Sequence, residues 1–87
     1  MLDARGRPAI RLNDSTDHGG RVKTAFSNLL SEGRAVTGEG HWVWCPKCNG
    51  DFRILPSSSA RRHEGRTIAY EGDLTECGAR LLASPAD

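Results

Sequence analysis

Gly33 to Pro46 reads GRAVTGEGHWVWCP, and two other segments of the chain align with it without a gap. They are GRPAIRLNDSTDHGG, from Gly6, and GRTIAYEGDLTECGA, from Gly65. Self-similarity of this kind is typical of folds built from repeats. We therefore expect one domain over residues 1–87, made of three repeats that start near these glycines.

The repeats share a position that suits a metal ligand. The residue twelve positions after each repeat glycine is His18, Cys45 or Cys77, and all three are types that bind zinc. A polar turn precedes this position, with Asn13-Asp14 in the first repeat and Gly72-Asp73 in the third. One shared offset for three ligand types predicts loops that converge about a pseudo-threefold axis.

The stretch WCPKCNG, Trp44 to Gly50, resembles half of a zinc site. Two cysteines two residues apart form the usual zinc knuckle, but the chain has no second pair and only one other cysteine, Cys77. Adding Cys48 to His18, Cys45 and Cys77 gives a closed Cys₃His tetrahedron. Because catalytic zinc keeps an open position, we expect one structural Zn²⁺.

Two further histidines compete as zinc ligands. His41 precedes Cys45 by four residues, which is ~13 Å along an extended strand, so it reaches the metal only if the loop curls. Loops that follow a glycine often curl, and His41 is the leading alternate ligand. His63 lies outside the repeat alignment, in the basic run ARRHEGR, and a surface position is expected for it.

The apolar pattern favours an all-β fold. PAIRL, AVTG and TIAYE supply strand-compatible residues early in each repeat, and a second strand is expected to lead away from each ligand loop. Residues 21–32 also fit a helix, since Phe26, Leu29 and Leu30 have helical spacing. The repeat pattern favours strand there. Trp42 and Trp44 share one strand face, where a core or interface contact is expected rather than membrane insertion.

Composition restricts the class of protein. With 87 residues, 37% of them hydrophobic, the core alone is marginal and a staple is expected. An odd number of cysteines and a charged N-terminus argue against a disulfide scaffold and a signal peptide, so synthesis in the cytoplasm is expected. Twelve Lys and Arg against eleven Asp and Glu provide no general attraction to nucleic acid or anionic lipid.

Two other functional classes fit parts of the sequence. A zinc-ribbon nucleic-acid binder would use the knuckle and ARRHEGR, but the near-neutral charge, the lack of a second cysteine pair and the three-repeat alignment argue against it. A small metalloenzyme would use His18 or His41 with Asp14, Asp17 or Asp73 as base. Those aspartates are better explained as turn formers, so no catalytic residue is expected.

The motifs GRPAIRLNDSTDHGG, CPKCNG and GDLTECGARLLAS, in this order, resemble the PAAR-repeat proteins that tip the spike of bacterial type VI secretion systems. The resemblance runs from Gly6 to Ser84. The name motif appears as Pro8-Ala9-Ile10-Arg11, and the second repeat has Glu39-Gly40-His41 where Gly-Asp is common.

This resemblance implies a small conical domain with a zinc ion near its apex. It also implies a structural role, as one cap on the blunt end of a trimeric β-helical spike protein. Effector proteins and transient contact with a target membrane are further implied, with export from the bacterial cytoplasm on the secretion spike.

Overall fold

The computed structural model describes residues 2–56 and 61–84. Within these ranges the protein consists of ten short strands joined by turns, without a helix. The all-β prediction is therefore confirmed. With no helix in the described residues, none is long and apolar enough to cross a membrane.

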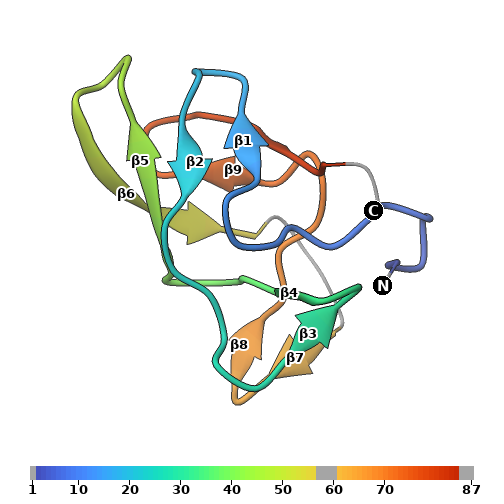
Figure 1. The fold of residues 1–87 in the computed structure, drawn as a ribbon. Helices are drawn as coiled ribbons and strands as arrows, with labels where there is room; N and C mark the ends of the chain where they lie inside the picture. The colour runs from blue at the N-terminus through green and yellow to red at the C-terminus, as the bar shows by residue number, and fades with distance from the viewer. Residues whose placement is uncertain (1, 57–60, 85–87) are drawn as a thin grey trace.

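Six of the strands form a sheet that nearly closes into a barrel, in the order β10-β1-β2-β5-β6-β9. It is built from three hairpins, one from each repeat, which pair with one another in antiparallel fashion (Figure 1). Their strands are β1 (Ser15–Thr16), β2 (Arg21–Val22), β5 (Trp42–Cys45), β6 (Gly50–Leu55), β9 (Leu74–Thr75) and β10 (Leu81–Leu82). The strands predicted to lead away from the ligand loops are thus present.

Three smaller hairpins turn at the repeat glycines. Two are the pairs β3 (Leu30–Ser31) with β4 (Arg34–Ala35) and β7 (Arg62–His63) with β8 (Arg66–Thr67), at the bottom of Figure 1, and the bridge Leu2–Pro8 forms the third. Gly6, Gly33 and Gly65 have φ of 79°, 85° and 80°. This left-handed backbone favours glycine, which explains why each repeat begins with one.

A closed ring of backbone hydrogen bonds interlocks the three repeats. Four positions after the repeat glycine, Ile10 N donates to Ala69 O (2.9 Å), Ala69 N to Thr37 O (3.1 Å) and Thr37 N to Ile10 O (2.9 Å). A second cycle runs around the repeats in the opposite sense, from Leu12 N to Ala35 O, from Glu39 N to Thr67 O and from Glu71 N to Pro8 O. Because each repeat donates to one neighbour and accepts from the other within each cycle, the arrangement is pseudo-threefold, as predicted.

The core follows the same symmetry. One cluster contains the residue three positions after each repeat glycine, together with Phe26 and Tyr70. These three residues are Ala9, Val36 and Ile68. A second cluster, inside the barrel, is built around Val22, Ile54 and Leu81, one from the outgoing strand of each repeat. Small apolar layers of this size give limited hydrophobic stabilisation, in line with the need for a staple.

Residues 21–32 do not form a helix. β2 ends at Val22, β3 begins at Leu30, and the connection between them is irregular. Val22 is buried in the barrel cluster and Phe26 in the other cluster. Burial in two separate places, not one helical face, therefore decides the path of this segment.

Contacts between repeats, here called inter-repeat bridges, join the arginine after a repeat glycine to the residue eight positions after another repeat glycine, and two of them are ion pairs. Arg34 Nη2 lies 2.8 Å from Asp14 Oδ1, and Arg7 Nη1 lies 3.3 Å from Asp73 Oδ1. Both aspartates are buried. Each also accepts a hydrogen bond from the backbone N–H three residues earlier, at 2.8 and 2.9 Å. The Gly-Arg starts and the aligned aspartates are thus two halves of one contact.

The two tryptophans lie on the outer face of the barrel. Trp42 and Trp44 are 39% and 37% exposed, while Val43 and Cys45 between and after them point inward. The guanidinium of Arg53 lies 5.0 Å from the Trp42 ring centre. Of the two alternatives for these rings, the core contact is therefore wrong, and the interface contact stays a prediction.

Candidate metal centre

The loops of the first and third repeats are matching tight turns. Gly19 N donates to Thr16 O (3.0 Å), and Gly78 N donates to Thr75 O (2.9 Å). The glycines have φ of 80° and 84°, as in a turn followed by a bulge. The residue just before each glycine is a candidate ligand, so both turns present it at the tip of a hairpin.

Threonine hydroxyls hold these turns together. Thr16 Oγ1 accepts hydrogen bonds from the backbone N–H of His18 (3.2 Å) and Gly20 (3.0 Å), and Thr75 Oγ1 accepts one from Ala79 N (3.2 Å). This role of the two threonines was not predicted from the sequence. The signal was available, because both threonines stand ten positions after their repeat glycine.

The hairpin of the second repeat is longer. Asp14 O and Asp73 O accept hydrogen bonds from N–H groups eight positions later, whereas His41 O accepts one from Ile54 N, thirteen positions later. The added length carries the loop between Cys45 and Gly50, which pair across the end of the hairpin. This loop holds Cys48, so the second repeat presents two candidate ligands instead of one.

The three hairpin tips bring His18, Cys45, Cys48 and Cys77 together. One ligand atom from each lies within 4.8 Å of all the others, and this group could hold a metal ion. Cys45 Sγ and His18 Nδ1 are 3.5 Å apart. A tetrahedral ion with bonds of about 2.3 Å to sulfur and about 2.0 Å to nitrogen would separate them by about 3.5 Å. Donor types and spacing therefore both fit a four-coordinate site.

The cysteines of this group have unequal acidity. Desolvation, together with the neighbouring sulfurs of Cys45 and Cys77, raises the pKa of Cys48 to about 11. Desolvation also acts to raise the pKa of Cys77, but hydrogen bonds led by that of the Thr75 hydroxyl outweigh it and lower the pKa to about 7. Crowded thiols hinder one another's ionisation, and a bound cation would relieve this because metal ligands bind as thiolates.

Asp17 lies beside the group and joins two hairpin tips. Its Oδ1 accepts a hydrogen bond from Arg80 N (2.8 Å), and its own N–H donates to Arg80 O (3.0 Å). The same Oδ1 lies 3.9 Å from His18 Nε2. The carboxylate therefore lies on the Nε2 side of the His18 ring, while Nδ1 lies toward Cys45. A carboxylate on that side is a common outer partner of a metal-binding imidazole.

His41 and His63 lie outside the group. His41 Nδ1 is 3.1 Å from Thr24 Oγ1 and its Nε2 is 3.4 Å from Arg66 Nη1. His63 Nε2 is 2.7 Å from Asn28 Oδ1. The loop after Gly40 does not curl toward the cysteines. Its His41 instead contacts Arg66, in the position that Asp14 and Asp73 have in the inter-repeat bridges.

The fold and the site define a class of protein: a small all-β domain of three interlocked repeats, with a group suited to a metal ion at the meeting point of three hairpins. A comparison with protein-family models matches the PAAR motif over residues 4–83, nearly the whole chain. The chain therefore belongs to the PAAR-motif family. This is the family of type VI secretion spike-tip proteins, and it is structural rather than catalytic. A search of curated proteins finds no match.

Proposed function

We propose that this protein is a zinc-stabilised, non-enzymatic cap on the end of a trimeric β-helical spike of a type VI secretion system, one copy per trimer. The closed ring through Ile10, Thr37 and Ala69 is the observation that carries the proposal. It allows a single chain to offer a pseudo-threefold surface to a partner with true threefold symmetry. Family membership supports the same role.

The three small hairpins at the repeat glycines suit docking on a β-helix. Among the described residues, β3 pairs only with β4, and β7 pairs only with β8. Each therefore has one edge that no other described strand pairs with, although Ser31 O in β3 already accepts a hydrogen bond from Arg11 Nη1. The Leu2–Pro8 bridge occupies the third equivalent position. Strand addition at such edges is a common mode of protein recognition.

Exposed leucines lie on two of these hairpins. Leu2 is 56% exposed and Leu30 is 64% exposed, and they have equivalent places in the first and second repeats. Burying such side chains against a partner would add about 1.5 kcal/mol or more for each. Docking at this end leaves the metal group at the opposite end, where it would form the tip.

Zinc is the ion that this donor set fits best. Three thiolates and one imidazole at tetrahedral spacing are typical of structural zinc sites. His18, Cys45, Cys48 and Cys77 would hold it, and it would supply a rigid link between hairpins from all three repeats. A tip that punctures a membrane must resist deformation, and binding energy of about 10 kcal/mol or more provides this where the core is small.

Elemental analysis of protein purified without chelators tests the zinc proposal. We expect one zinc per chain, and Cys77→Ser should remove it and lower the melting temperature. Protein free of zinc, or a Cys77→Ser variant that melts like the wild type, would contradict the proposal.

Native mass spectrometry of the protein with the spike trimer from the same cell tests the cap. We expect three spike chains to one of this chain. Leu30→Glu should weaken the complex roughly tenfold or more, whereas Leu74→Glu should not, because Leu74 is 40% exposed but lies on the barrel. Three copies per trimer, no association, or equal effects of the two variants would refute capping.

Export on the spike and carriage of effector proteins are parts of the same proposal, supported by the family. The protein should appear in culture medium only when the secretion system is active. Effectors should co-purify with the capped spike and be absent from the spike alone. Release that does not depend on secretion, or effectors bound equally to bare spikes, would contradict these parts.

A further inference from the structure

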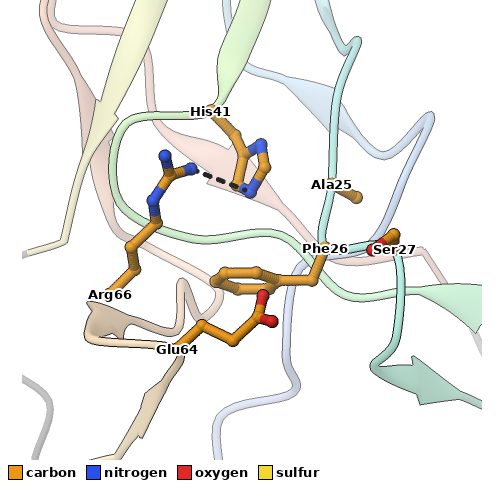
Figure 2. Close-up of a pocket in the computed structure, with 6 residues that line it drawn as sticks. All are labelled: Ala25, Phe26, Ser27, His41, Glu64 and Arg66. Atoms are coloured by element: carbon orange, nitrogen blue, oxygen red, sulfur yellow. Dashed lines mark hydrogen bonds between the residues drawn. The ribbon is translucent and has the colours of Figure 1, made fainter.

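The third inter-repeat bridge differs from the other two. The position held by Asp14 and Asp73 in the first and third repeats is His41 in the second. Arg66, the arginine that follows the third repeat glycine, directs Nη1 toward His41 Nε2 at 3.4 Å (Figure 2). Two bridges thus join an arginine to a buried carboxylate, while the third joins an arginine to an imidazole.

His41 cannot neutralise the charge of Arg66. Guanidinium groups only donate hydrogen bonds, so His41 Nε2 must be the acceptor and Nδ1 carries the proton toward Thr24 Oγ1, 3.1 Å away. Burial, with the charge of Arg66, lowers the pKa of His41 and keeps the ring neutral near pH 7. The bridge therefore retains a net positive charge.

The nearest carboxylates are engaged elsewhere. Glu39 Oε1 accepts a hydrogen bond from Thr67 N (3.3 Å), and Glu64 Oε2 accepts one from Asn28 Nδ2 (3.3 Å). In Figure 2 the Glu64 carboxylate lies beside the Phe26 ring, while the Arg66 guanidinium points toward His41. Among residues 2–56 and 61–84, no acidic side chain forms an ion pair with Arg66.

A hollow beside Arg66 gives access to its charge. It has a volume of about 410 Å³, and it is also lined by Arg53, whose guanidinium lies over the Trp42 ring. Gly40 and Gly65 also line it, and a Cβ atom added at either would meet nothing within 4 Å. The hollow therefore has room for a side chain of a partner beside residues that include two arginines.

We propose that Arg66 and Arg53 bind an acidic side chain of a partner protein, whose carboxylate takes the role that Asp14 and Asp73 have in the other bridges. Two forked guanidinium groups match the planar geometry of a carboxylate. Glu39 also lines the hollow, so its two arginines and one carboxylate leave a net single positive charge, which one carboxylate of a partner would neutralise. This site does not depend on spike capping, since its occupant is defined by charge alone.

Titration with N-acetyl-aspartate N-methylamide, followed by NMR of the arginine side chains, tests the site. We expect saturable shifts at Arg66 and Arg53, with a dissociation constant on the order of millimolar at low salt. Arg66→Gln should weaken binding roughly tenfold or more. His41→Asp should do the same by supplying an internal carboxylate, and it should also raise the melting temperature.

Arg5→Gln provides the matched control, since it removes one exposed arginine outside all the bridges and should leave binding unchanged. Inorganic phosphate is the comparison ligand and should bind more weakly than the aspartate derivative. Binding that is equal in wild type and Arg66→Gln, or tighter for phosphate, would overturn the proposal. So would a His41→Asp variant that binds as well as the wild type.

Discussion

Removal of the Asp14 carboxylate should cost a large part of the stability of this domain. The carboxylate is buried and accepts three hydrogen bonds, from Arg11 N (2.8 Å), Arg34 Nη2 (2.8 Å) and Ser84 Oγ (2.6 Å). Asp14→Ala leaves all three donors without this acceptor. Breaking a buried ion pair by removing one partner typically costs about 3–5 kcal/mol. We expect this magnitude here, against about 5–15 kcal/mol for the whole stability of a small domain.

Urea unfolding of zinc-loaded protein measures this loss, with equal metal content confirmed for each variant. Asp51→Ala is the control, because Asp51 forms an ion pair with Lys23 (2.9 Å) in which both side chains are more than one third exposed. Exposed pairs contribute about 0–1 kcal/mol. The reasoning fails if Asp14→Ala costs no more than Asp51→Ala, because the inter-repeat bridges would then be incidental surface contacts.

Three further predictions concern the site and the backbone. Cys48→Ser should lower zinc affinity far more than His41→Ala, since of these two residues only Cys48 lies in the candidate metal group. Competition with a chromogenic chelator measures the zinc affinity of both variants, and the reverse order would make His41 the ligand. Gly20→Ala should strongly destabilise the fold, because the added Cβ would lie 1.9 Å from Trp44 O, whereas in Gly50→Ala the added Cβ meets no atom closer than 3.6 Å. Thermal melting compares the two variants, and similar losses in melting temperature would contradict this prediction. The free energy of unfolding should fall as the pH drops below 6.5, since the lowered pKa of His41 makes the unfolded chain bind more protons than the folded one. His41→Gln should make this dependence on pH weaker, and equal dependence in the variant and the wild type would contradict the prediction.

The repeat arrangement could be predicted because its causes are local. A glycine with positive φ begins each repeat, and the aspartates of two repeats hydrogen-bond to their own backbone three residues earlier. Both features can be recognised within one short stretch of sequence. The partners across repeats could not be predicted in this way. Nothing near Arg34 in the sequence indicates that its guanidinium reaches Asp14, because that contact depends on how the repeats close around the axis.

The placement of the tryptophans shows a second limit. Trp42 and Trp44 alternate with Val43 and Cys45, so the strand and its two faces could be predicted. Which face points inward could not, since the larger apolar residues are expected to be buried. Val43 and Cys45 are both fully buried, and Cys45 also belongs to the group that could hold a metal ion. The inward face of this strand thus combines a core residue with a candidate ligand, and the tryptophans that alternate with them lie outward.

The longer second hairpin explains why the metal group departs from the symmetry of the rest of the fold. A strict threefold repeat offers one ligand from each hairpin tip, and three ligands leave a tetrahedral ion with an open position. An open position would admit water and give the reactivity of a catalytic site. The second repeat breaks the symmetry only at its tip, where the loop after Cys45 returns Cys48 to the same point. A fourth candidate ligand is therefore supplied without disturbing the ring through Ile10, Thr37 and Ala69, so one chain can combine four residues that could enclose a metal ion with a pseudo-threefold arrangement of its repeats.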